Sequence, residues 1–253
     1  MDIKGKTIVI TGGGQGLGFT MAKNFAKSGA NIALIDLNEE ALKDSVDQIK
    51  QEGVAARYYV ANVTNESQVE KVFQEIAKDF NGIDGLVNNA GILRDGMFIK
   101  AKEGVVNKKM SLEQFQSVVD VNLTGVFLCG REAAVHMIEG GRKGVIINMS
   151  SIARAGNMGQ TNYAASKAGV VAMSVTWARE LARHDIRVGA IAPGVISTSM
   201  TDAMKPEMRD RLKKMAPVNR LGEADEVAHA AKFIFENEFF TGRTVELDGG
   251  LSM

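Results

Sequence analysis

The chain has 253 residues, of which 45% are hydrophobic and 24% are charged. Its 30 lysines and arginines balance its 30 aspartates and glutamates, so its formal net charge is zero. This balance argues against a general binder of nucleic acid, because such binding needs an excess of basic residues. The composition is typical of a globular protein, and we predict one domain that spans residues 1–253.

Cys129 is the only cysteine, and the sequence has three scattered histidines. An intrachain disulfide is therefore excluded, no metal site is predicted, and a reducing compartment is expected. The first residues lack the apolar stretch of a signal peptide, and no run of 18 apolar residues occurs. We predict a cytoplasmic protein with no membrane partner, in which Cys129 is a packed thiol inside a helix.

Seven short apolar runs, taken in chain order, are predicted as strands. The predicted strands are Thr7–Ile10, Asn31–Asp36, Arg57–Val60, Gly85–Asn88, Val145–Met149, Arg187–Ala192 and Thr244–Leu247. The helical segments between them are Phe19–Ser28, Glu39–Glu52, Glu66–Phe80, Leu112–Glu139, Tyr163–Arg183 and Ala224–Phe235. Nearly continuous apolar strands that alternate with helices predict a single-domain α/β fold, a doubly wound (Rossmann) parallel seven-stranded sheet with helices on both faces.

The segment 192–222 interrupts this alternation between the sixth strand and the last helix. It holds all three prolines and four methionines, Met200, Met204, Met208 and Met215. A long excursion at the carboxyl end of a strand is a candidate substrate lid. A surface helix that packs its methionines explains the segment equally well.

A glycine-rich turn follows the first strand and leads directly into a helix. Gly12, Gly16 and Gly18 lack a Cβ, which permits a tight turn, close approach of a pyrophosphate and close packing of the helix on the strand. Glycine spacing alone is weak support, but here a strand precedes the turn and a helix follows it. The segment is therefore interpreted as a dinucleotide-binding turn.

Asp36 ends the second strand, 20 residues after Gly16, where a dinucleotide site places the residue that contacts the adenosine ribose. A carboxylate accepts hydrogen bonds from both ribose hydroxyls and repels a 2′-phosphate. The sequence thus favours NAD(H), with NADP(H) as the alternative cofactor. The competing interpretation is that Asp36 only caps the following helix.

Tyr163 and Lys167 lie four residues apart at the start of a predicted helix, so they share one face. An ammonium near a phenol favours the phenolate and lowers the pKa of the tyrosine, which suits proton exchange with an alcohol. The same spacing also describes two ordinary neighbours on a helix.

Six motifs follow one another along the chain. They are Thr11-Gly12-x-x-x-Gly16-x-Gly18, Asn88-Asn89-Ala90-Gly91, Asn122, Ser150-Ser151, Tyr163-x-x-x-Lys167 and Pro193-Gly194. Their order resembles that of the short-chain dehydrogenase/reductase family. The resemblance extends from about Lys6 to Gly250 and is closest to the 3-oxoacyl-[acyl-carrier-protein] reductases and acetoacetyl-CoA reductases.

The resemblance implies a role for each matching residue. Tyr163 would be the general acid in ketone reduction, Lys167 would lower its pKa and hold the nicotinamide ribose, and Asn122 would anchor a water-linked proton relay. The cofactor would lie along Gly12, Gly14, Gln15, Gly16, Leu17, Gly18, Asp36, Leu37, Asn62, Val63, Asn89, Ala90, Gly91, Tyr163, Lys167, Pro193, Gly194, Ile196 and Thr198.

Three departures from the family pattern stand out. The spacing to Tyr163 selects Ser150 as the catalytic serine, whereas the strand alignment selects Ser151, which we prefer because a loop absorbs a deletion more easily than a buried strand. Asn62 replaces the usual aspartate near the adenine and is expected to accept from its amine. The segment 96–110 is longer than usual, and its four lysines either contact a phosphate-bearing substrate or belong to a solvated loop, which we prefer.

The expected activity is hydride transfer between a nicotinamide cofactor and a ketone or secondary alcohol. The favoured substrate is a 3-oxoacyl thioester on coenzyme A or a carrier protein. A dehydrogenase of a sugar, polyol or steroid and a non-catalytic dinucleotide sensor are the alternatives. The resemblance also implies a homotetramer, with the predicted helices Leu112–Glu139 and Tyr163–Arg183 at one interface.

Overall fold

The computed structural model describes residues 1–198, 201 and 206–251. Seven parallel strands form one sheet in the order β3-β2-β1-β4-β7-β8-β9. The strands are β1 (Thr7–Thr11), β2 (Asn31–Asp36), β3 (Ala56–Val60), β4 (Gly85–Asn88), β7 (Gly144–Met149), β8 (Ile186–Pro193) and β9 (Thr244–Leu247). The predicted doubly wound fold is confirmed. The strand order reverses between β1 and β4, and ligands of such sheets bind at the carboxyl ends of the strands near that point.

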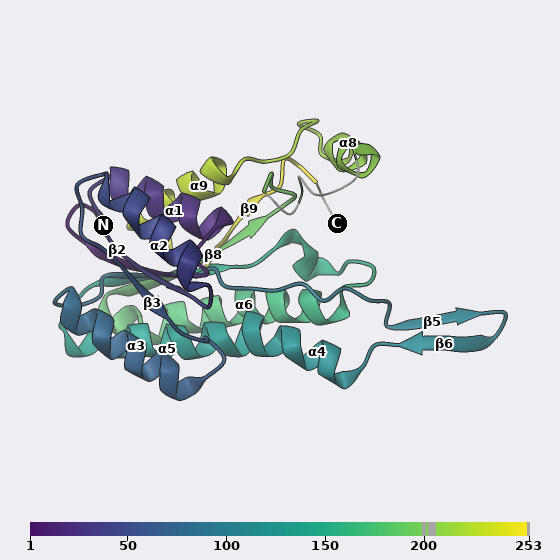
Figure 1. Cartoon of the computed structure of the whole chain (residues 1–253), viewed down its shortest axis with the longest axis horizontal. Helices are drawn as coiled ribbons and strands as arrows, with labels where there is room; N and C mark the ends of the chain where they lie inside the picture. Colours follow the sequence, from purple (N-terminus) through teal and green to yellow (C-terminus); the bar gives the residue numbers. More distant parts are fainter. Residues whose placement is uncertain (199–200, 202–205, 252–253) are drawn as a thin grey trace.

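Helices cover both faces of the sheet (Figure 1). One face carries α1 (Gly16–Lys27), α2 (Glu39–Lys50) and α9 (Ala224–Glu236). The other face carries α3 (Glu66–Asp79), α4 (Leu112–Val119), α5 (Gly125–Glu139) and α6 (Thr161–Glu180). Side chains of β1 alternate between the two buried clusters, with Ile8 and Ile10 in one and Val9 in the other. A strand buried on both faces needs this continuous apolar run.

The beginning of α1 differs from those of its neighbours. Asn38, Asn65 and Ser111 cap α2, α3 and α4 by accepting a hydrogen bond from a backbone N–H of the first turn. Gln15 precedes α1, and within the described chain its side chain makes no such bond. The N–H groups at the start of α1 are therefore open to an external anion, which the helix dipole favours.

The predicted helix Leu112–Glu139 is interrupted in the structure. A π-helical turn, η1 (Asp120–Thr124), separates α4 from α5. Asn122 lies in this turn and is fully buried. Single π turns inside α-helices are frequent at functional sites, because the extra residue redirects the side chains around it.

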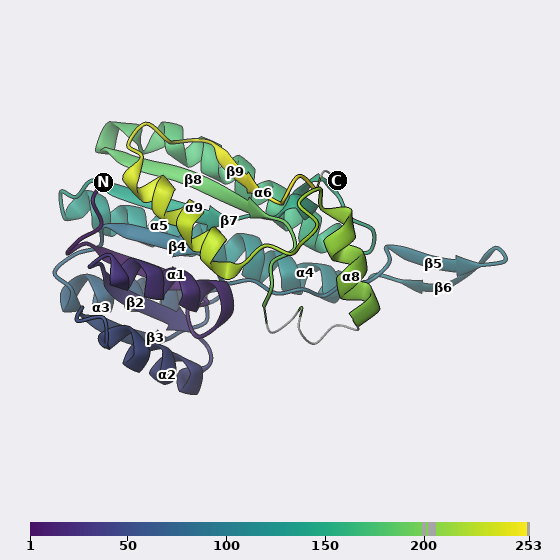
Figure 2. The same cartoon turned by 90° about the horizontal axis from the view of Figure 1, so that it is seen from above.

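The segment 96–110 forms a hairpin rather than the loop that we preferred from the sequence. β5 (Ile99–Lys102) and β6 (Val105–Lys109) pair antiparallel, and all residues from 97 to 109 are exposed. The hairpin extends beyond the other elements in both views (Figures 1 and 2). Its solvated character was predicted, but its regular pairing was not.

The candidate lid contains α8 (Pro206–Met215), which lies near the carboxyl end of β9 (Figure 2). Met208 and Met215 of this helix are half-exposed, so neither is a core residue. Met200 and Met204 lie outside the described residues. The described residues also include two short 3-10 turns, η2 (Ile152–Ala155) and η3 (Ala182–His184). Among the described residues, no helix is both long and apolar enough to cross a membrane.

Candidate active site

The glycine turn after β1 is packed too closely for side chains. A Cβ on Gly18 would overlap the carbonyl oxygen of Gly12, and a Cβ on Gly12 would lie 2.9 Å from the Cα of Ala90. Gly12 also has a φ of +64° and Gly16 one of +57°. The amide of Asn89 donates to the carbonyls of Thr11 and Gly12 at 3.1 and 3.0 Å. This turn, together with the uncapped start of α1, fits a dinucleotide pyrophosphate.

Asp36 connects the glycine turn to the turn after β2. Its Oδ2 accepts from the N–H of Gly14 at 3.1 Å, and its Oδ1 accepts from Leu37 and Asn38 at 2.7 and 3.2 Å. The capping residue of α2 is Asn38. The interpretation of Asp36 as only a helix cap is therefore wrong. Its carboxylate stands beside the glycine turn, while the side chain of Leu37 is 66% exposed.

Asn62 and Val63 follow β3, and the side chains of both contact other residues of the protein. Asn62 Oδ1 accepts from both the N–H and the hydroxyl of Thr64, at 3.0 and 2.9 Å. The oxygen that we expected to accept from the adenine amine is thus already used. Val63 packs against the start of α5, where a Cβ on Gly125 would lie 2.9 Å from its Cγ2.

The two adjacent serines after β7 have different environments. Ser150 is buried, and its hydroxyl donates to the carbonyl oxygen of Lys167 at 2.8 Å. Ser151 accepts from the N–H of Ala153 at 3.1 Å, and its side chain is close enough to the Tyr163 hydroxyl to oppose, in part, the rise of the pKa of Tyr163 on burial. Ser151 therefore lies beside the tyrosine, whereas Ser150 fastens β7 to α6.

Lys167 is buried and points toward the end of β7. Its Nζ donates to the carbonyl oxygen of Met149 at 2.7 Å and lies 5.7 Å from the centroid of the Tyr163 ring. Burial lowers the pKa of Lys167 to about 8. The ammonium thus stands over the ring.

The structure corrects the expected pKa of Tyr163. Burial raises this pKa, and the hydrogen bond with Ser151 lowers it by less. The prediction that Lys167 lowers the pKa of Tyr163 is therefore wrong for this geometry, in which the pKa is raised. A phenol loses solvation of its charged form when it is buried, and here that loss dominates.

Asn122 holds the Asn-Asn-Ala-Gly turn, residues 88–91, close to Lys167. Its Oδ1 accepts from the N–H of Ile92 at 2.8 Å, and its Nδ2 donates to the carbonyl of Ile92 at 3.0 Å. A Cβ on Gly91 would lie 3.3 Å from Asn122 Oδ1 and 3.7 Å from Lys167 Nζ. Asn122 and Lys167 are therefore close, as expected, but the side-chain amide of Asn122 is occupied by the backbone.

Two groups of buried polar residues near the site were not predicted. Asn162 donates to the carbonyls of Arg94 and Gln114 and accepts from the N–H of Tyr163, which fixes the start of α6. Asn88 donates to Asn148, which donates to Ser174 on α6, at 2.8 and 2.9 Å. Amides inside otherwise apolar strands are the sequence signal that identifies this second group.

The segment after β8 closes the opposite side of the site. Gly194 donates to the carbonyl of Leu247 at 2.9 Å, and a Cβ on it would lie 2.8 Å from the Cα of Asp248. Ile196 bridges to Gly222, and the N–H of Thr198 donates to Thr201 at 2.8 Å. Pro193 and these residues thus lie at the carboxyl end of β8, where the cofactor was expected.

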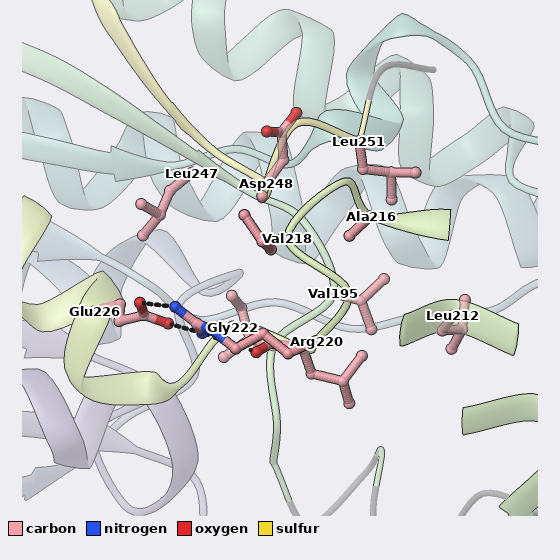
Figure 3. Close-up of a pocket in the computed structure, with 13 residues that line it drawn as sticks. Val195, Leu212, Ala216, Val218, Arg220, Gly222, Glu226, Leu247, Asp248 and Leu251 are labelled. Carbon is pink, nitrogen blue, oxygen red and sulfur yellow. Dashed lines mark hydrogen bonds and ion pairs between the residues drawn. The ribbon is translucent and has the colours of Figure 1, made fainter. Parts of the chain in front are cut away.

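A pocket of about 220 Å³ lies between this segment, α8 and the end of β9 (Figure 3). Its apolar lining includes Val195, Leu212, Ala216, Val218, Leu247 and Leu251. Ile152, directly after Ser151, packs in one buried cluster with Ala216 and Leu251. At one side the Arg220 guanidinium pairs with the Glu226 carboxylate at 2.8 and 2.7 Å. The described residues contain no group of three or more candidate metal ligands.

Comparison with known proteins extends these observations over the whole chain. The family model described as Enoyl-(Acyl carrier protein) reductase matches residues 12–252. The 3-oxoacyl-[acyl-carrier-protein] reductase FabG of Thermotoga maritima is 40% identical over 256 residues, with 99% of each chain covered. The protein of the same name from Staphylococcus aureus (strain Mu50) is 36% identical and covers 98% of each chain.

A solved structure titled NAD+-bound xylitol dehydrogenase superposes with a TM-score of 0.87 at 29% identity, and the match covers 99% of this chain and 100% of that one. The glycine turn, the Ser151–Tyr163–Lys167 cluster and these full-length similarities lead to one conclusion. The chain belongs to the short-chain dehydrogenase/reductase family and is an NAD(P)-dependent oxidoreductase.

Proposed function

We propose that the protein reduces 3-oxoacyl thioesters to 3-hydroxyacyl thioesters. The observation that carries this proposal is the cluster of Ser151, Tyr163 and Lys167 beside a glycine turn that fits a dinucleotide. The names of the relatives from Thermotoga maritima and Staphylococcus aureus favour an acyl thioester over other ketones.

Each residue of this cluster has its own role in reduction of the carbonyl group. The Tyr163 hydroxyl donates its proton to the carbonyl oxygen, and the Ser151 hydroxyl donates a hydrogen bond to the same oxygen. The nicotinamide, when bound, supplies the hydride. Lys167 holds a positive charge near the phenol and offers N–H donors to a ribose hydroxyl. Its pKa of about 8 leaves it mostly protonated at neutral pH.

Asp36 supports a preference for NAD(H) over NADP(H). In the proposed binding mode the 2′-phosphate of NADP(H) would approach this carboxylate, which already accepts three backbone hydrogen bonds that hold it in place. A fixed negative charge repels a phosphate and cannot turn away cheaply. The measurement is kcat/KM with NADH and NADPH, and an equal or higher value with NADPH contradicts the assignment.

The pocket under α8 is proposed to receive the acyl chain, with segment 192–222 as the lid. Two of its lining residues, Ala216 and Leu251, belong to one buried cluster with Ile152, the residue after Ser151. The test is a steady-state panel of 3-oxoacyl thioesters of increasing length, with xylitol and other polyols as competitors. Thioesters should be the better substrates.

A polyol dehydrogenase is the second candidate, because the xylitol dehydrogenase structure superposes over the full chain. A higher kcat/KM for xylitol oxidation than for reduction of every thioester would select this alternative. A non-catalytic sensor would turn over neither class of substrate.

We also propose the homotetramer that the sequence suggested. On α5 the half-exposed Phe127, Val135 and Ile138 lie along one stripe at helical spacing. On α6, Ala165, Ala168 and Ala172 are exposed, so a partner helix can approach closely. Light scattering measures the mass, and the 27.2 kDa of a single chain contradicts the assembly. The cytoplasmic location stays a prediction.

A further inference from the structure

The hairpin of β5 and β6 has no part in the proposed chemistry, yet it is well defined. Glu103 and Gly104 at its tip have φ values of +53° and +76°. These left-handed values at both central residues are those of a type I′ turn, which matches the twist of two paired strands. The hairpin is therefore a built projection rather than an irregular loop.

The register places three of the four lysines of the hairpin on one face. Lys100 pairs with Lys108, and Lys102 pairs with Val105. Cross-strand partners share a face, and so do side chains two apart on β5. On β6 this alternation is interrupted, because the register shifts between Lys100 and Ala101 and leaves Asn107 as an extra residue. Lys100, Lys102 and Lys108 therefore form one surface, here called the cationic face. Ile99, Ala101, Val106 and Lys109 lie on the other face.

The cationic face is electrostatically unfavourable in the isolated chain. Like charges directly opposite each other, as Lys100 and Lys108 are, destabilise a strand pair. In the described part of the chain, the only ion pair of the hairpin is Lys102 with Glu103, at 3.8 Å between two exposed side chains. Such exposed pairs contribute little. A negatively charged partner would offset the repulsion between these lysines, and this relief would favour binding.

The base of the hairpin is attached to the wall of the active site. The N–H of Gly96 donates to the carbonyl of Gly159 at 2.8 Å, and Gln160 donates to the Asp95 carboxylate at 2.9 Å. Gly159 and Gln160 directly precede α6, and Tyr163 lies within its first turn. The base of the hairpin is therefore tied to the residues that precede α6, the helix that carries Tyr163.

We propose that the cationic face docks an acidic protein surface, that of a carrier protein which delivers the thioester. This inference rests on the proposed function. A protein fits better than a small phosphate-bearing carrier, because the face lies along an arm that extends away from the body (Figures 1 and 2). A second copy of this chain fits less well, since it has a formal net charge of zero and brings the same lysines.

The test compares one acyl group on three carriers. The 3-oxobutyryl group is offered on an acidic acyl carrier protein, on coenzyme A and on N-acetylcysteamine, which carries no charge. In the triple variant Lys100→Gln, Lys102→Gln, Lys108→Gln, KM for the carrier-protein substrate should rise about tenfold with kcat unchanged, and its dependence on salt should weaken. KM for the N-acetylcysteamine thioester should stay the same.

Lys109→Gln is the matched control, because it removes one lysine from the other face of the same hairpin. It should change KM for the carrier-protein substrate less than Lys100→Gln does. An unchanged KM in the triple variant overturns the proposal, and so does an equal rise for the coenzyme A thioester, which would assign the lysines to phosphate binding. A lower oligomer mass of the triple variant would assign the face to a second copy. If the wild type does not reduce even the N-acetylcysteamine thioester, the proposed function itself fails.

Discussion

Replacement of each adjacent serine by alanine should separate catalysis from support. In Ser151→Ala the hydroxyl beside Tyr163 is lost, and we expect kcat to fall by about 10²- to 10³-fold, as for removal of one donor to a developing oxyanion. The fold should be kept, because Ser151 is partly exposed and its hydrogen bond with Ala153 lies in a short turn.

Ser150→Ala should act mainly on stability. Ser150 is 4% exposed, and its hydroxyl donates to the Lys167 carbonyl at 2.8 Å. Loss of one buried hydrogen bond costs about 1–2 kcal/mol, which in a domain of this size lowers Tm by roughly 2–8 °C. We expect kcat to fall by about tenfold at most, because only the position of α6 is loosened.

The assay is steady-state reduction of acetoacetyl-CoA with NADH, together with thermal unfolding of both variants. The account predicts a large loss of kcat with a small change in Tm for Ser151→Ala, and the reverse for Ser150→Ala. If Ser150→Ala loses as much kcat as Ser151→Ala while Tm is unchanged, the assignment of the two serines is wrong.

Three further predictions follow from buried or crowded groups. Without cofactor, Lys167→Met should raise the free energy of unfolding at pH 7. This gain should shrink between pH 8 and 10.5, because in that window the unfolded wild-type chain binds more protons than the folded one. Urea titrations at several pH values measure the gain, and a gain that persists at pH 10.5 contradicts the prediction. The double variant Asp36→Ala, Leu37→Arg should raise kcat/KM with NADPH and lower kcat/KM with NADH. Leu37→Arg alone should change the ratio of these two values less. An unaltered ratio in the double variant would mean that Asp36 does not determine the choice of cofactor. Gly18→Ala should weaken NADH binding at least about tenfold, because its Cβ would overlap the Gly12 carbonyl; titration calorimetry measures this, and wild-type affinity would show that the turn can move aside.

Much of the fold could be predicted because its signals are local. The buried strands are mostly apolar, as the run Ile8-Val9-Ile10 of β1 is, and the glycine turn has the spacing that its close contacts require. The helix boundaries were less accurate. The π turn at Asn122 was missed because nothing in the hydrophobic pattern of residues 112–139 marks an extra residue per turn.

The sequence indicated that Tyr163 and Lys167 lie together, but it did not indicate their electrostatics. The helical spacing placed Tyr163 and Lys167 on one face, but it could not show that the ammonium points to the Met149 carbonyl or that burial dominates the pKa of the phenol. The two serines were ambiguous in sequence because the spacing to Tyr163 selects Ser150, whereas the strand alignment selects Ser151. The hairpin was missed because Glu103-Gly104 is an uncommon pair for a type I′ turn.

Tyr163 is proposed as the proton donor in reduction of a 3-oxoacyl thioester, and Tyr163→Phe removes only the hydroxyl that would donate this proton. NADH oxidation with acetoacetyl-CoA should fall by at least about 10²-fold in this variant, while the Kd for NADH measured by titration should stay close to that of the wild type. Turnover at the wild-type rate with Phe at this position would contradict the account.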